Sequence, residues 1–182
     1  MASATVTVDL VVRDLLHTDL AGCAWTGSPT HLRYISAALG RRASGAVDYL
    51  AVCGPSDLPL GVGGVDYRRR PDAGWLWQFV VHPAFRSCGL GTLLVRAAED
   101  RIQRRGLAHA ELGVEATNTG ARRLYTRLGY RVTREEGEEW DAVDAGGRPV
   151  RRRAHCVMMR RTLGSADGVV GVSPRSPRPS AG

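Results

Sequence analysis

The sequence predicts a single α/β domain with a mixed, mostly antiparallel central sheet that contains one parallel strand pair and is flanked by helices. Two observations carry this prediction. Residues 75–114 read as strand, helix and strand, a unit that implies two parallel strands joined by a right-handed crossover. Upstream, two short apolar segments joined by Gly54-Pro55-Ser56-Asp57 read as a hairpin, which makes the rest of the sheet antiparallel.

The first half of the chain supplies the early strands and a broken helix. Residues 5–12 alternate β-branched with small residues and predict the first strand. A helical segment over 15–39 is interrupted at Gly27-Ser28-Pro29-Thr30, and a second helix restarts at His31. After a turn at 40–45, strands are expected at 47–53, 60–67 and 75–81, with a polar turn at 68–74.

The second half alternates helices with strands. Apolar residues recur at helical spacing and predict a long helix from about 89 to 105, closed by Gly106. A strand at 109–114 leads into a helix at 118–128, capped by Thr117 or Asn118 and ended by Gly129 in the left-handed conformation. Two last strands flank a loop at 144–149, one starting near Tyr130 and one at 154–161.

Composition separates a folded part from a tail and excludes several classes of protein. Residues 164–182 are rich in Gly, Ser and Pro and predict a disordered tail behind a domain of residues 1–163. The four cysteines are widely spread and no H-x-x-x-H occurs, so we expect neither a disulfide scaffold nor a metal site. No apolar run approaches 18 residues and no signal peptide is recognisable, so a cytoplasmic protein with no membrane partner is expected.

The net charge of +7 comes from 25 basic residues, all of them arginine. A solvated surface is the favoured reading, with attraction for a polyanionic ligand as a weaker one. Sequence-specific nucleic-acid binding would need an aromatic platform or a reading helix, and the sequence contains neither. Nucleic acid is therefore not an expected partner.

The turn between the strand at 75–81 and the long helix is the most informative segment. It reads Arg86-Ser87-Cys88-Gly89-Leu90-Gly91-Thr92 and places free backbone N–H groups at the positive end of a helix, where phosphate is the usual anion. A Walker loop is excluded because the chain has no lysine, and a dinucleotide fingerprint is excluded because Leu94 stands at its third glycine position. The pattern left is Arg-x-x-Gly-x-Gly.

A second motif follows about thirty residues later. Asn118-Thr119-Gly120-Ala121 and Leu124-Tyr125 through Gly129-Tyr130 match N-x-x-A-x-x-L-Y-x-x-x-G-[FY]. In this order and at this separation, the two motifs resemble those of the GCN5-related N-acetyltransferase (GNAT) family, over residues 75–131.

The resemblance implies an N-acetyltransferase that moves an acetyl group from acetyl-CoA to a primary amine, by direct transfer in a ternary complex and without a metal. A small-molecule acceptor is favoured over a protein amine; a non-catalytic acyl-CoA-binding module is the alternative, and homodimers are common in the family. The family's acetyl-CoA contacts map onto Val80, Val81, Arg86, Ser87, Cys88, Gly89, Leu90, Gly91, Thr92, Asn118 and Tyr125.

Tyr125 is the residue that the resemblance makes catalytic, as a donor to the departing CoA sulfur. A tyrosine near pKa ~10 and a thiol near ~8.5 differ by about 2 kcal/mol, so a hydrogen bond to the thiolate is favoured over full proton transfer. A covalent mechanism through Cys88 is disfavoured, because no general base is evident beside it.

The general base and the acceptor pocket are left open by the sequence. The strand at 75–81 has no carboxylate that could act as the base. Glu111 on the next strand is a candidate, but a surface position for it is equally consistent with the sequence. Asp66, Glu115 and Asp141 can be argued as the base equally well. An aromatic pocket can be drawn from Trp25, Tyr67, Trp77 and Trp140. The acidic run Glu135, Glu136, Glu138 and Glu139 can attract a cationic amine, but a solvated loop is the favoured reading.

Overall fold

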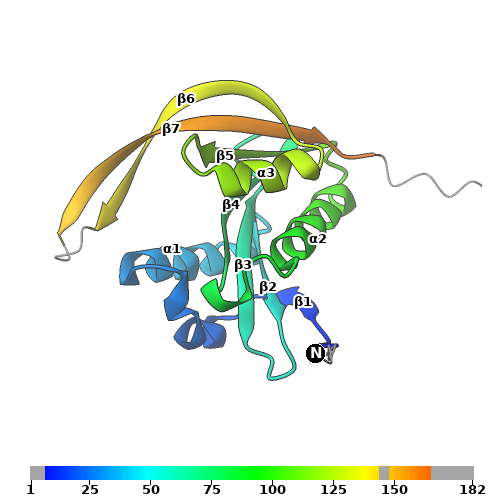
Figure 1. The fold of residues 1–182 in the computed structure, drawn as a ribbon, viewed down its shortest axis with the longest axis vertical. Coiled ribbons are helices and arrows are strands. Elements are labelled where there is room, and N and C mark those ends of the chain that lie inside the picture. The colour runs from blue at the N-terminus through cyan, green and yellow to red at the C-terminus, as the bar shows by residue number, and fades with distance from the viewer. Residues whose placement is uncertain (1–6, 144–147, 165–182) are drawn as a thin grey trace, which may run out of the picture.

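A seven-stranded sheet organises the chain in the computed structural model, which describes residues 7–143 and 148–164 (Figure 1). The strand order is β1-β2-β3-β4-β5-β7-β6. Only β4 and β5 are parallel, and every other neighbouring pair is antiparallel. The predicted fold class is thereby confirmed. The predicted tail lies, from residue 165 on, outside the described residues, as do residues 144–147 of the predicted last loop.

The elements follow the predicted order. The strands are β1 (Val11–Asp14), β2 (Val47–Cys53), β3 (Pro59–Asp66), β4 (Ala73–Val81), β5 (His109–Glu115), β6 (Arg131–Val143) and β7 (Pro149–Thr162). The α-helices are α1 (Pro29–Gly40), α2 (Leu90–Arg104) and α3 (Thr119–Arg127), and the 3-10 helices are η1 (His17–Thr26), η2 (Arg42–Ser44) and η3 (Pro83–Phe85).

Two predicted strand boundaries and one helix type were wrong, and a neighbouring strand decides each of the two boundaries. The first strand starts at Val11 and not at residue 5, since its register places Val11 opposite Cys53, the last residue of β2. The first helical segment is a 3-10 helix. The last strand starts at Pro149 and not at 154, because β6 continues to Val143 and pairs with it.

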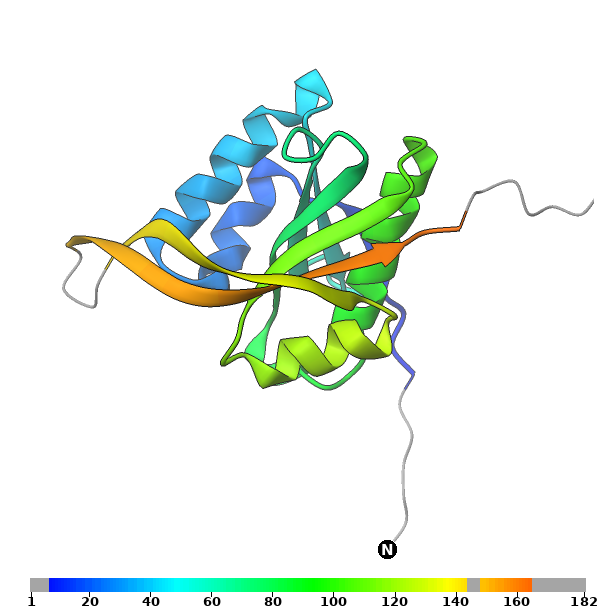
Figure 2. The ribbon, with the colours of Figure 1, turned by 90° about the horizontal axis from the view of Figure 1, so that it is seen from above.

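Both faces of the sheet are covered by helices (Figure 2). On one face α2 and α3 pack with Leu50, Val52 and Leu112 of the strands, whereas on the other α1 and η1 pack with Tyr49 and Ala51. Successive residues of β2 therefore enter opposite cores, as the period of two requires. This two-sided burial explains why β2 reads as a continuous apolar run.

Two irregularities of the sheet create space for a site. β4 and β5 pair only as far as Leu76 opposite Leu112, and beyond that point the two strands part. Gln78 has φ +55, and the β3–β4 register shifts there, as a bulge does. The β6–β7 hairpin continues beyond β5, and in both views its free end reaches past α1.

None of the helices in residues 7–143 and 148–164 is long and apolar enough to cross a membrane.

Candidate functional site

The turn after β4 begins α2 with an exposed row of backbone groups. Gly89 is the N-cap residue at φ +85, Ser87 has φ +63, and residues 86–89 are exposed. The first bond of the helix runs from the Leu93 N–H to the Gly89 carbonyl oxygen at 3.1 Å. The N–H groups of the first turn of α2 therefore have no acceptor in the helix and concentrate its positive end at this surface.

The two glycines of this turn have different structural roles. A Cβ on Gly89 would meet nothing within 4 Å, so its glycine is required by the positive φ. A Cβ on Gly91 would lie 3.3 Å from Leu124 Cδ2, so its small size lets α2 approach α3. Cys88 is an exposed free cysteine whose thiol lies 3.5 Å from the Arg86 carbonyl oxygen.

The second motif forms α3 as predicted. The Asn118 side-chain oxygen accepts from the Ala121 N–H at 3.1 Å, so Asn118 and not Thr117 is the cap. Gly129 has φ +91, and the N–H groups of Gly129 and Tyr130 bond to the last carbonyls of the helix, each at 3.0 Å. This C-terminal stop is the one the glycine predicts.

Tyr125 is the buried residue of α3 and belongs to the main core. It is 8% exposed, and its ring packs edge-on against Tyr130 at 5.6 Å between centroids. Burial raises the pKa of Tyr125 to about 12. The hydroxyl is therefore protonated at neutral pH. It has no hydrogen-bond partner within residues 7–143 and 148–164, so it is free to donate to a ligand.

Beyond Leu76 and Leu112 the strands β4 and β5 part, and this gap is called the opening below. A cavity lies beside it on the α1 face of the sheet. Val80 and Val81 end β4, pair only with β3, and pack into opposite cores. The cavity has a volume of about 960 Å³ and is lined by α1, by the β6 arm and by the parting strands at Leu76, Gln78 and Gly113. The described residues that line it include neither Tyr125 nor any of 86–92. The cavity therefore reaches the parting strands but not the turn.

Carboxylates outnumber arginines in the cavity lining although the chain as a whole is basic, and four of them are ion-paired with arginine. The lining contains Arg69 as the one arginine among the described residues, against five carboxylates, namely Glu115, Glu136, Glu138, Glu139 and Asp141. The expectation of a solvated loop for the acidic run was wrong. Residues 131–143 form β6, and the cavity is lined by its residues 136–142, Glu136 and Glu138 among them. The spacing E-x-E-x-W at 136–140 is the signal that could have revealed this.

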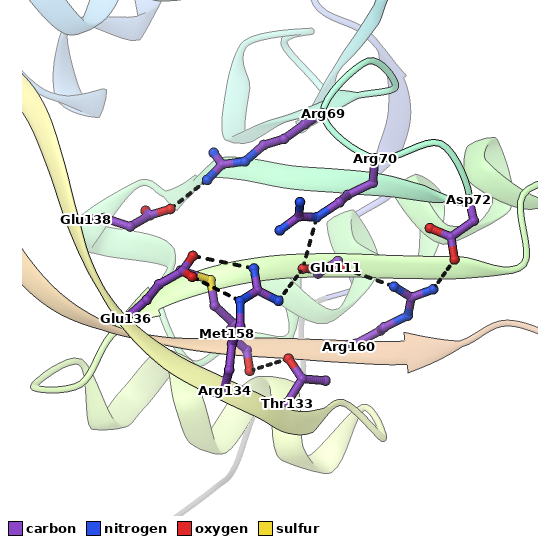
Figure 3. A network of polar contacts seen from close by, with 10 residues as sticks. All are labelled: Arg69, Arg70, Asp72, Glu111, Thr133, Arg134, Glu136, Glu138, Met158 and Arg160. Carbon is purple, nitrogen blue, oxygen red and sulfur yellow. Dashed lines mark hydrogen bonds and ion pairs between the residues drawn. The ribbon is translucent and has the colours of Figure 1, made fainter.

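Glu111 is neither a surface residue nor a free base. It is 2% exposed, and both carboxylate oxygens are taken by guanidinium groups (Figure 3). Arg70 Nε and Arg134 Nη1 donate to Oε1 at 3.3 and 3.2 Å, and Arg160 Nη1 donates to Oε2 at 3.2 Å. These ion pairs make Glu111 the centre of a structural network that joins β5, β6, β7 and the turn before β4.

The other candidates divide by position. Glu115 and Asp141 line the cavity, whereas Asp66 does not and accepts from the Arg68 N–H at 2.8 Å. Of the four predicted aromatic residues, Trp77 and Trp140 line the cavity. Trp25 instead packs against His82, and the Tyr67 hydroxyl donates to Asp48.

Sequence reasoning missed His31, which lines the cavity from α1. Its Nδ1 lies 3.3 Å from Gln78 Nε2, and the Gln78 side-chain oxygen accepts from the Tyr49 hydroxyl at 3.1 Å. Burial lowers the pKa of His31, which keeps the imidazole neutral at pH 7. A single histidine in a helical segment has no sequence signal, since only the fold brings it beside the bulge of β4.

No group of three or more His, Cys, Asp or Glu side chains within residues 7–143 and 148–164 is arranged to hold a metal ion.

Comparison with known proteins identifies the family. The GNAT acetyltransferase family model matches residues 20–130, more than half of the chain, and the chain belongs to this family. Members of this family use acetyl-CoA as co-substrate and an amine as acceptor.

Two curated relatives match the chain over part of their length. L-2,4-diaminobutyric acid acetyltransferase of Streptomyces coelicolor is 37% identical over 84 residues, 43% of this chain and 49% of the relative. An uncharacterised N-acetyltransferase of Methanocaldococcus jannaschii is 31% identical over 88 residues, 46% of this chain and 39% of the relative. The matches thus span less than half the length of either relative.

The fold is shared with solved acetyltransferases. The ribosomal-protein-S18-alanine N-acetyltransferase of Escherichia coli superposes with a TM-score of 0.67 at 18% identity, over 89% of this chain and 99% of that one. At this identity the similarity establishes the fold alone.

Proposed function

We propose that this chain transfers an acetyl group from acetyl-CoA to the primary amine of a small cationic molecule, directly and in a ternary complex. The observation that carries the proposal is the opening between β4 and β5. The exposed N-terminus of α2 follows β4 in the chain, and the carboxylate-lined cavity reaches the parting strands at Leu76 and Gly113. A thioester arm laid between β4 and β5 would carry its acyl group from the α2 side to an amine held in this cavity.

On the acetyl-CoA side, the N–H groups of Leu90, Gly91 and Thr92 hold the pyrophosphate, and the turn Arg86-Ser87-Cys88-Gly89 forms its rim. The edges of Val80 and Val81 that face the opening pair with the pantetheine arm as an added strand would. Asn118 caps α3 and contacts the same arm. Tyr125 donates a hydrogen bond to the leaving sulfur, supported by its protonated, unpartnered hydroxyl.

On the acceptor side, the carboxylates in the cavity lining favour a cation. Tyr34 of α1 and Trp140 of β6 are exposed aromatic side chains in its lining, and such rings attract ammonium groups. The relative named for L-2,4-diaminobutyric acid supports an acceptor with two amines, since that compound carries two.

A non-catalytic acyl-CoA-binding module is the second candidate. It is favoured by one observation: β4 carries no carboxylate, and Glu111 of β5 is held by three arginines.

One experiment separates the two. Calorimetric titration with acetyl-CoA tests the first half-site, and thiol release then tests turnover with a panel of L-2,4-diaminobutyrate, spermidine, 1,4-diaminobutane, butylamine and an alanine-terminated peptide. We expect micromolar binding and the highest kcat/KM with the dicationic amines. Binding without turnover across the panel would favour the module, and absence of binding would refute both functions.

A further inference from the structure

Glu138 and Gly113 both line the cavity, and the Glu138 side chain faces Arg69 (Figure 3). The side chain of Glu138 is 28% exposed, and its Oε1 accepts from Arg69 Nη2 at 2.6 Å. Its Oε2 lies 3.5 Å from the position that a Cβ on Gly113 would occupy. Gly113 is the first residue of β5 beyond the last one paired with β4. The second oxygen of Glu138 therefore lies directly over the place where the strands part.

The carboxylate is held there by Arg69 and by the absence of a side chain at Gly113. The Arg69 guanidinium lies over the Trp75 ring, 3.7 Å from its centroid, so the donor to Oε1 is itself fixed. A side chain on Gly113 would meet Met158 at 3.0 Å and then Glu138. The space above the opening is thus left to the end of the Glu138 side chain.

The neighbouring carboxylates are placed differently. Arg134 donates to both oxygens of Glu136, and Glu111 is held by three arginines. Glu115 is exposed at the end of β5, with no side-chain partner in residues 7–143 and 148–164. Glu138 alone among these four combines partial burial, one fixed oxygen and one oxygen without a partner among the described residues.

We propose that Glu138 is the general base of the acetyl transfer, with Arg69 as the residue that positions it. This inference rests on the proposed function. Oε2 first holds the acceptor ammonium by a charge-assisted hydrogen bond, and one proton of the ammonium leaves to solvent to free the lone pair. A base on this side of the opening faces the amine and not the CoA moiety.

The amine nitrogen bonds to the thioester carbonyl carbon, and the carbonyl electron pair moves onto oxygen. The nitrogen, now positive and acidic, gives its proton to Glu138 Oε2. The pair on oxygen reforms the carbonyl, the carbon–sulfur bond breaks, and CoA leaves as a thiolate. The thiolate takes up a proton from solvent, and Glu138 returns its own proton to solvent, leaving an N-acetylated product and CoA thiol.

The decisive variant is Glu138→Gln, which keeps the size of the side chain and removes the base. The acceptor probe is the panel amine with the highest kcat/KM for the wild type. A positioned general base contributes about 10²- to 10⁴-fold, so we expect kcat to fall at least about 100-fold, with the Kd for acetyl-CoA unchanged within about twofold. Glu135→Gln is the matched control, because Glu135 pairs with His155 at 2.8 Å outside the cavity lining.

Arg69 tests the positioning role separately. Arg69→Met is expected to lower kcat with little change in KM, and Arg69→Lys to recover much of the loss, since an ammonium can still bind Oε1. Recovery by lysine is a readout that a purely structural arginine over Trp75 would not produce.

The outcomes distinguish this inference from the function on which it rests. A wild-type protein that binds acetyl-CoA and acetylates no panel amine refutes the proposed function. A wild type that turns over, with Glu138→Gln within about threefold of it, refutes only the role of Glu138. A loss of about 100-fold in Glu115→Gln and not in Glu138→Gln would also refute it, and would place the base on β5.

Discussion

Replacing Tyr125 with phenylalanine removes one hydroxyl group from the proposed acetyl-CoA side. Burial raises the pKa of this tyrosine to about 12. A thiol titrates near ~8.5, so full proton transfer to the thiolate is uphill by roughly 3.5 pH units, or about 5 kcal/mol. We therefore expect Tyr125 to act by donating a hydrogen bond, and a hydrogen bond to a charged group contributes about 1.5–3 kcal/mol. We expect Tyr125→Phe to lower kcat by about 10- to 150-fold.

The assay is thiol release at saturating acetyl-CoA and amine, with calorimetry for acetyl-CoA affinity. The unfolding midpoint should not change, because the hydroxyl has no partner among the described residues. Tyr130→Phe is the matched control, since its ring adjoins Tyr125 but its hydroxyl lies beside Glu99. A kcat within about twofold of wild type, at unchanged affinity, would refute the hydrogen bond. A loss of wild-type activity between pH 8 and 10 that Tyr125→Phe abolishes would contradict the raised pKa.

Three further predictions concern stability and binding. Glu111→Ala leaves three arginines without their shared carboxylate. It should lower the free energy of unfolding, measured by urea denaturation, by about 3 kcal/mol. An unchanged midpoint would contradict the structural role of the network. Gly91→Leu should weaken acetyl-CoA binding at least about tenfold, because a side chain there pushes α2 away from Leu124. Normal affinity in calorimetry would refute the assignment of the turn. The pKa of His31 is lowered in the folded state, so the unfolded chain takes up a proton at a higher pH than the folded protein does. The free energy of unfolding should therefore fall as the pH drops below ~6.5. Urea midpoints compared at pH 7.5 and 5.5 should show this loss in the wild type and a smaller one in His31→Gln.

Local patterns predicted the parts of the site that depend on backbone conformation. Gly89 and Gly129 adopt the positive φ values that their positions at helix ends require, and Asn118 caps α3. Each of these depends on a few adjacent residues, which is why the sequence suffices. The 3-10 form of η1 and the late start of β1 were missed, because the register of β1 on β2 and the packing of η1 on the sheet decide them.

The acceptor side could not be predicted in the same way. In the sequence, Glu111 of β5 cannot be told from a surface carboxylate on a strand, and only the convergence of Arg70, Arg134 and Arg160 makes it structural. His31 reaches the cavity because α1 packs across the face that carries the bulge at Gln78.

The sequence by itself determined the fold class, the order of the elements and the two motifs that form the proposed acetyl-CoA side. These follow from hydrophobic period, turn residues and glycine conformation, which are properties of neighbours along the chain. Only the tertiary structure decided which carboxylates face the opening. Glu138 and Gly113 are 25 positions apart in the sequence. The sheet order β5-β7-β6 and the Arg69 side chain stacked on Trp75 together bring the second carboxylate oxygen of Glu138 over Gly113. Charge placement in a site depends on strand register and on long-range packing, and no local pattern encodes either.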